Sequence, residues 1–148
     1  MSLNIRTKGQ NGEREIANEL DLIIKTVLNE LNIPLPRINI IQRNQNQSAV
    51  GGSDLSNVFD LSIEVKRQET LNINTWWKQC IKSAERNNHI PILIFRQNRK
   101  SWRVVMNGLL NVGNKQIQTR VEIEYEDFKY WFYLYSKQQF ENGYELKI

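Results

Sequence analysis

The feature that most limits the folds open to this chain is the run IPILIF at residues 90–95. A strand that is apolar on both faces needs cover on both faces, which is typical of the centre of a sheet between helices. A helical pattern at 74–87 precedes this run, and an alternating pattern at 59–66 precedes the helix. Because a helix between two strands acts as a crossover, the sequence predicts that the strands at 59–66 and 90–95 are parallel.

The other segments extend this to an α/β fold with a mixed sheet. Residues 9–31 carry apolar side chains every three or four positions and predict a long amphipathic helix. Asn74 is the expected N-cap of the helix at 74–87. The remaining expected elements are a strand at 38–43, a polar loop at 44–53, strands at 102–106 and 117–125 after a basic turn at 96–101, and an aromatic helix at 127–140.

Composition excludes several classes of function. With one cysteine and one histidine in 148 residues, a structural zinc site and a Ser-His-Asp hydrolase are not expected. Cys80 lies in the helical apolar pattern and is expected to be buried, and His89 is expected in a turn. The net charge of +4 suits an anionic partner.

The length predicts one domain over 1–148. The absence of a membrane-length apolar run or signal-peptide pattern predicts no membrane association and a cytoplasmic location.

Asp54 is followed ten residues later by Glu64-Val65-Lys66, a D…E-x-K pattern. The alternation at 59–66 predicts that Glu64 and Lys66 share one face of a strand. Two carboxylates can hold a divalent cation against a phosphate, and a lysine can orient water or stabilise charge developing on phosphorus. Charged residues also alternate on ordinary half-exposed strands, so the pattern alone is equally consistent with a strand that has no catalytic role. The glycines at 51–52 suggest a tight turn or a close approach of the backbone to a phosphate.

Glu13 adds a third acid to this set. It precedes Ile16 by three positions and Ala17 by four, so it lies on the stripe of the first helix that is expected to be buried. A carboxylate facing the interior needs a partner, and a metal site would supply one. The alternative is a carboxylate at the helix start, stabilised by the helix dipole.

With these residues in this order, the chain resembles the PD-(D/E)xK nuclease superfamily, and within it phage-type Holliday junction resolvases. The resemblance covers about residues 8–107. Its motifs are KGQNGERE at 8–15, GGSD at 51–54, IEVKRQE at 63–69, LN at 71–72, WKQ at 77–79 and PILIFR at 91–96.

The resemblance implies a central mixed sheet flanked by helices, with a restriction-endonuclease-like αβββαβ core. It also implies dependence on Mg²⁺ or Mn²⁺, DNA as the partner and a homodimer. The implied metal ligands are Glu13, Asp54, Glu64 and the Val65 carbonyl, and the implied catalytic residues are Glu13, Asp54, Glu64, Lys66 and Gln79. The family usually has a proline before the aspartate, where this chain has Ser53. Asp60, four residues before Glu64, therefore competes with Asp54, which we prefer because the glycines precede it.

Basic and aromatic residues suggest surfaces for partners. The candidate DNA contacts are Lys8, Arg14, Arg67, Arg96, Arg99 and Lys100, with a solvated surface as the alternative for each. Trp76 and Trp77 are adjacent, so at most one is expected on the inner stripe of their helix; Trp76 is the candidate for base stacking or a dimer interface. The aromatic residues of the last helix either join that interface or close the core of the monomer; they are Phe128, Trp131, Phe132 and Tyr135.

Three functions remain open at this stage. The first is a metal-dependent endonuclease that acts on branched DNA, most simply a Holliday junction resolvase of a phage working in the host cytoplasm. The second is a restriction-like or repair nuclease that acts on duplex ends and would use the same catalytic residues. The third is a non-catalytic DNA-binding module on the same fold. The intact set of Glu13, Asp54, Glu64 and Lys66 argues against the third.

Overall fold

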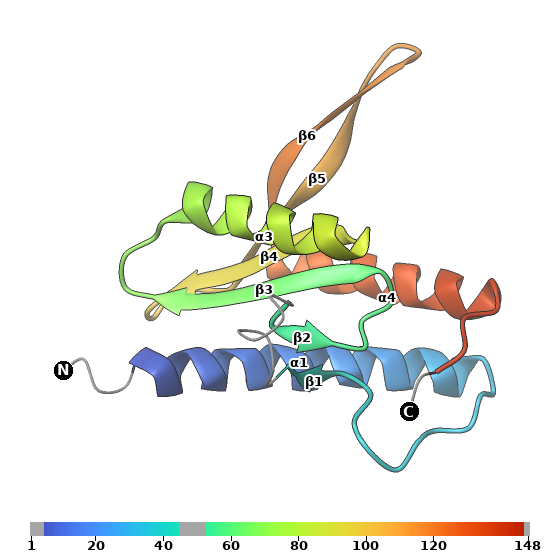
Figure 1. Ribbon diagram of the computed structural model, residues 1–148. Coiled ribbons are helices and arrows are strands. Elements are labelled where there is room, and N and C mark those ends of the chain that lie inside the picture. The colour runs from blue at the N-terminus through green and yellow to red at the C-terminus, as the bar shows by residue number, and fades with distance from the viewer. Residues whose placement is uncertain (1–4, 45–52, 147–148) are drawn as a thin grey trace.

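A computed structural model describes residues 5–44 and 53–146, with side chains from residue 7 onward (Figure 1). The glycines at 51–52 and most of the expected polar loop lie outside this range. The elements are α1 (Ile5–Glu30), β1 (Gln42–Arg43), β2 (Leu55–Ser56), β3 (Leu61–Gln68), α3 (Ile73–Asn87), β4 (Ile90–Gln97), β5 (Arg103–Val112), β6 (Lys115–Glu124) and α4 (Tyr125–Glu141).

The main sheet has the strand order β3-β4-β5-β6. β3 and β4 are parallel, with Leu61 opposite Ile90 and Gln68 opposite Gln97, whereas the other pairs are antiparallel. β1 and β2 form a separate two-stranded sheet. The parallel crossover, the mixed sheet and the order α1-β1-β2-β3-α3-β4 confirm the predicted αβββαβ class.

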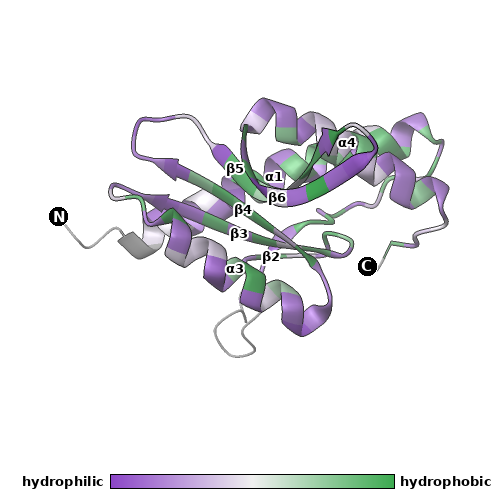
Figure 2. Ribbon diagram, turned by 90° about the horizontal axis from the view of Figure 1, so that it is seen from above, coloured by the Kyte–Doolittle hydropathy of each residue, from purple (hydrophilic) through white to green (hydrophobic). Residues whose placement is uncertain are grey.

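Helices cover both faces of the sheet, as the apolar run at 90–95 requires. α3 packs on one face against β3 and β4, and α1 lies on the opposite side together with α4 (Figure 1). Ile92 and Ile94 belong to the core beneath α1 and α4, whereas Leu93 and Phe95 belong to the core beneath α3. Figure 2 shows hydrophobic residues along β3 and β4 between these layers. Within the described residues, no helix combines the length and apolarity needed to cross a membrane.

Three predictions about element boundaries were wrong. α1 begins at Ile5, so Glu13 lies well beyond the first turn, where the helix dipole offers little stabilisation. The N-cap of α3 is Asn72 rather than Asn74. The strand expected at 38–43 is reduced to 42–43. The physical reason is that the buried carboxylate of Asp21 accepts hydrogen bonds from the backbone amides of Ile40 and Ile41, at 2.6 and 2.9 Å. These amides therefore cannot join a strand ladder.

Trp76 is not exposed, contrary to the prediction. The side chains of Trp76 and Trp77 are only 5% and 7% exposed, because both pack with Phe95 and Val105 in the core between α3 and the sheet. Phe128 and Phe132 of α4 are fully buried in the other core. Phe128 and Phe132 therefore close the core of the monomer, which was the second of the two alternatives, whereas Trp131 and Tyr135 are half-buried and pack against that core. Cys80 is buried, as predicted.

The β5–β6 hairpin projects beyond the sheet. β4 pairs only with residues 103–106 of β5, while the β5–β6 ladder continues to Val112 opposite Lys115. Residues 107–120, called the arm below, therefore extend beyond the part of β5 that pairs with β4 (Figure 1). At the base of the arm, Arg120 still contacts Asn74 of α3. Four large aliphatic side chains of the arm are more than half exposed: Leu109, Leu110, Val112 and Ile117. Unlike the aromatic residues of α4, they have no covering layer in the described structure.

Candidate active site

Asp54 is bound to the outer edge of β3 through both its backbone and its side chain. Within the main sheet as described, β3 has a strand partner on one side only. The Asp54 amide donates to the Ile63 carbonyl at 3.1 Å, and Asp54 Oδ2 accepts from the Val65 amide at 2.7 Å. Asp54 thus satisfies backbone groups that would otherwise be unpaired at the edge of a sheet. Its side chain is 7% exposed.

Three acids from distant parts of the chain meet at this edge. The Asp54 carboxyl interacts with the carboxyls of Glu64 and Glu13. Glu64 comes from β3 and Glu13 from α1, which packs against β3, and both are buried. The charge of Lys66 acts on both Asp54 and Glu64. Asp54 and Glu64 both have a raised pKa, so these two acids hold protons more tightly than isolated carboxyls do.

Burial changes the acidity of this cluster. It is the largest cause of the raised pKa of Asp54, and the hydrogen bond from the Val65 amide opposes the rise. Burial also raises the pKa of Glu64 to about 8; the neighbouring Asp54 charge adds to the rise, and the charge of Lys66 opposes it. Acids perturbed by burial together with a specific charged partner are typical of functional sites.

We expect the protein in chelator to lose stability as the pH rises from about 5 to 8. The folded pKa of Glu64 is raised from 4.5 to about 8, so the folded state holds a proton that the unfolded chain has released. This contribution is complete below the unfolded pKa and is lost as the pH approaches the folded pKa. Its size should be on the order of 4 kcal/mol, or roughly 8–16 °C in Tm.

Thermal unfolding of wild type and Glu64→Gln, scanned across this pH range, isolates the effect from other titrating groups. The variant cannot release that proton, so its Tm should decline less. Mg²⁺ should stabilise the wild type more at pH 8 than at pH 6, because ligand carboxylates must be deprotonated. Parallel pH curves for the two proteins would show that Glu64 is not the titrating group.

Two residues at the site were missed by the sequence reasoning. Arg43 of β1 forms an ion pair with Glu13, with Nε 3.4 Å from Oε1, and is largely buried. The Ser83 hydroxyl of α3 is hydrogen-bonded to the Glu64 carboxyl. Ser83 carried one weak signal, since it lies four residues after the predicted Gln79 and so shares its helix face. Arg43 carried none, because its contact with Glu13 depends on how β1 crosses α1.

Gln79 lies on α3 and Val65 on β3, and their predicted roles stay predictions. Gln79 is exposed, one helical turn before Ser83, and its side chain forms no hydrogen bond to the described residues. The Val65 amide points to the outer edge of β3, toward Asp54. The amide and carbonyl of one strand residue point to the same edge, so the Val65 carbonyl faces the acids as well.

Asp60, the alternative to Asp54, lies away from this cluster. It is exposed and precedes β3, and its carboxylate accepts a hydrogen bond from the Tyr135 hydroxyl of α4. Asp54, by contrast, contacts Glu64 directly. The geometry therefore favours Asp54 as the acid that acts with Glu64.

The predicted DNA contacts gather near one end of the molecule. Arg67 and Arg96 are opposite each other at the carboxyl ends of β3 and β4. The N-terminal part of α1 and the β4–β5 turn lie at the same end (Figure 1). The other candidates are placed there: Lys8 and Arg14 on α1, and Arg99 and Lys100, both exposed, in the turn.

The donor chemistry of the cluster fits a hard divalent cation, since carboxylate and carbonyl oxygens are the ligands that Mg²⁺ and Mn²⁺ prefer. Between residues 7 and 44 and between 53 and 146, however, no group of three His, Cys, Asp or Glu side chains has the geometry of a metal site. The acids bond one another, and Glu13 also pairs with Arg43. A bound cation would replace these contacts, so metal binding requires side-chain rearrangement and the release of protons.

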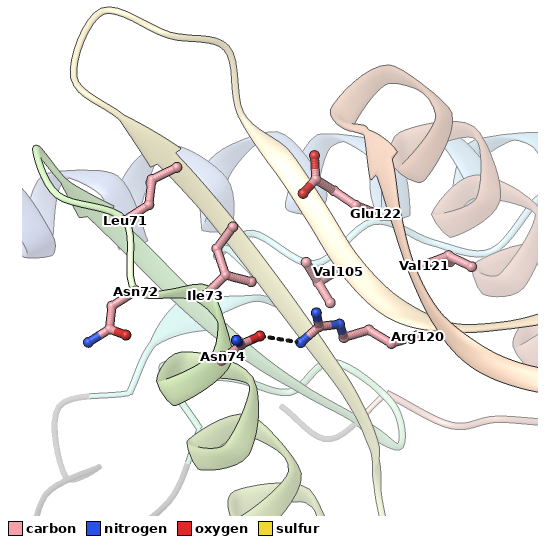
Figure 3. Close-up of a pocket in the computed structure, with 8 residues that line it drawn as sticks. All are labelled: Leu71, Asn72, Ile73, Asn74, Val105, Arg120, Val121 and Glu122. Carbon is pink, nitrogen blue, oxygen red and sulfur yellow. Dashed lines mark hydrogen bonds between the residues drawn. The ribbon is translucent and has the colours of Figure 1, made fainter.

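A pocket with a volume of about 510 Å³ lies elsewhere, between the start of α3 and the β5–β6 hairpin (Figure 3). The Arg120 guanidinium donates to Asn74 Oδ1 at 2.9 Å across it. Its lining residues are Leu71, Asn72, Ile73, Asn74, Val105, Arg120, Val121 and Glu122, and none of them is a predicted site residue. The three acids instead lie at the outer edge of β3, where the structure buries them.

A mixed sheet between helices, with the D…E-x-K acids and lysine gathered at the edge of β3, defines a protein of the PD-(D/E)xK nuclease class. The chain belongs to the family described as "Phage putative PDDEXK endonuclease", whose model matches residues 4–145. No curated protein sequence matches it significantly. Among solved structures it is similar to Archaeoglobus fulgidus Hjc, a Holliday junction resolvase from an archaeal hyperthermophile. That match has 16% identity and a TM-score of 0.37, and covers 75% of this chain and 98% of that one.

Proposed function

We propose that this protein is a metal-dependent endonuclease that hydrolyses phosphodiester bonds in branched DNA, and that its substrate is the four-way junction cut by resolvases. The observation that carries the proposal is the cluster of Asp54, Glu64 and Glu13 beside Lys66. A buried group of acids is costly to ionise unless a cation compensates it. Membership of an endonuclease family supports a role for that cation in phosphodiester chemistry.

Each residue has a distinct role in this proposal. Glu13, Asp54, Glu64 and the Val65 carbonyl would hold Mg²⁺ or Mn²⁺. When bound, such a cation neutralises charge on the phosphate and lowers the pKa of a coordinated water. Lys66 stabilises the negative charge that develops on the reacting phosphate. Gln79 orients water or phosphate from α3, and the ion pair with Arg43 holds the Glu13 carboxyl in place beside Asp54.

A comparison of substrates tests the proposal. A synthetic four-way junction, a linear duplex and a flap of matched sequence are incubated with the protein, with Mg²⁺ or with EDTA. We expect paired, metal-dependent cuts in the junction. Cleavage confined to duplex ends or flaps would favour a repair-type nuclease instead. Binding without cleavage of any substrate would indicate a DNA-binding module.

We further propose that the active form is a homodimer, because resolving a junction requires two symmetric cuts and the described part of this chain holds one such cluster of acids. A C₂ dimer would place two identical sites at a fixed separation. The buried aromatic residues of α4 cannot supply its interface. The aliphatic side chains of the arm are better candidates: Leu110 and Ile117 are opposite each other and each is 52% exposed.

The double variant Leu110→Glu/Ile117→Glu is expected to be monomeric in sedimentation and to fold normally, because both side chains are on the surface. Charges on an apolar contact between copies would be desolvated without partners. Leu22→Glu, on the 65% exposed Leu22 of α1, is the matched control and should remain dimeric. A wild type that is monomeric both alone and on junction DNA would contradict the dimer.

A further inference from the structure

Arg67 and Arg96 lie side by side on the face of the sheet that packs against α1. They are register partners at the carboxyl ends of β3 and β4. Alternate residues of a strand share a face, and Val65 and Ile94, two residues earlier in each strand, belong to the core beneath α1. Both guanidinium groups therefore project over the same surface. Lys66, one residue before Arg67, projects to the opposite face.

The buried side chain of Trp102 lies beneath this arginine pair. The Arg96 guanidinium sits 5.3 Å from the ring centroid of Trp102, which is 6% exposed. The Trp102 indole N–H donates to Glu15 Oε2 at 2.6 Å, which ties the ring to α1. Gly12 allows this close approach, since a Cβ there would lie 3.3 Å from the Trp102 ring and 3.6 Å from the Arg67 Cβ. The arginines are therefore placed on a fixed surface and do not extend freely into solvent.

The positive charge of this pair is not compensated. Across the described residues, neither Arg67 nor Arg96 has an ion-pair partner, and the Nε atom of each is buried without a hydrogen-bond acceptor. Glu15, the acid bound to Trp102, is engaged by the indole. Like charges opposite each other on neighbouring strands are destabilising, and so is a buried N–H without an acceptor. A ligand with several acceptor oxygens would relieve both costs.

We propose that Arg67 and Arg96 form a binding site for one backbone phosphate of the nucleic acid, distinct from the phosphate that is cleaved. The inference rests on the proposed function and specifies where the strand is held. Two planar guanidinium forks can share the tetrahedral oxygens of one phosphate. Because Lys66 and Arg67 project to opposite faces of β3, the bound phosphate belongs to a neighbouring nucleotide. The strand thus passes around the edge of the sheet, with one phosphate at the acids and another on the arginine pair.

DNA binding by variants, measured in Ca²⁺ or EDTA to prevent cleavage, gives the first test. Arg67→Ala and Arg96→Ala should each weaken binding about five- to twentyfold and reduce the slope of log K against log salt by about 1. The double variant should lose less than the product of the two, because the arginines share one phosphate. Arg37→Ala removes the same charge from an exposed loop and should change binding less than twofold. Equal effects at Arg37 and at the pair would overturn the proposal.

Methylphosphonate substitution locates the phosphate. Replacing single phosphates by neutral methylphosphonates should weaken wild-type binding at one position beside the cleaved bond. The Arg67→Ala/Arg96→Ala variant should be insensitive at that position and remain sensitive elsewhere. If every position affects both proteins equally, the arginine pair does not bind a defined phosphate.

Inorganic phosphate separates failure of this site from failure of the nuclease proposal. Millimolar phosphate, with chloride at matched ionic strength as the control, should raise the Tm of the wild type more than that of the double variant. If phosphate stabilises the protein but no DNA is cleaved, the proposed phosphate site at the arginines is supported and the nuclease proposal is wrong. Cleavage by the wild type, with unchanged DNA binding and no differential phosphate effect in the double variant, would remove the arginine site alone.

Discussion

Lys66→Ala is expected to reduce cleavage by about 10³-fold or more while DNA affinity changes by less than about threefold. The Lys66 charge acts directly on Asp54 and Glu64, so it lies where a phosphate meets the acids. A charge that acts mainly where negative charge develops in the transition state affects the rate far more than binding. Single-turnover cleavage and binding in Ca²⁺, measured on the same junction, separate the two quantities.

Lys66→Arg and Glu64→Ala complete this comparison. Arginine keeps the charge but changes its position, so partial activity should return. Glu64→Ala should be inactive and should bind DNA as well as the wild type or better, because it removes a negative charge near the phosphate. Cleavage by Lys66→Ala within tenfold of the wild type would exclude Lys66 from the mechanism.

Asp54→Asn and Asp60→Asn should differ by about three orders of magnitude in cleavage rate. Asparagine at 54 can still accept the Val65 amide but loses the charge next to Glu64. Asparagine at 60 can still accept the Tyr135 hydroxyl, which lies on the α4 side of the molecule. Cleavage should therefore fall about 10³-fold in the first variant and remain within twofold of the wild type in the second.

Unfolding measurements on the same two variants guard against a trivial explanation. Asp54→Asn removes a buried carboxyl whose pKa is raised in the folded state. The Tm of this variant in chelator should therefore equal or exceed that of the wild type at pH 8. Loss of activity with an unchanged Tm would assign the effect to chemistry. An inactive Asp60→Asn beside an active Asp54→Asn would reverse the choice between the two aspartates.

Much of the fold followed from periodicity within single segments. The apolar run at 90–95 predicted a covered central strand, and the helix between 66 and 90 predicted its parallel partner; both are confirmed. Failures came where contacts distant in sequence overrode the local pattern. Asp21 captures the amides of Ile40 and Ile41, and the core beneath α3 has room for both Trp76 and Trp77.

For the site, residue types and spacing were sufficient to name the acids and the lysine, because strand alternation and helix stripes are properties of local backbone geometry. Tertiary structure decided that Asp54 rather than Asp60 lies against Glu64, that Arg43 pairs with Glu13, and that Arg67 is opposite Arg96. Acidity and charge compensation depend on burial and on through-space distance. Elements far apart in the sequence determine both, and no local pattern encodes them.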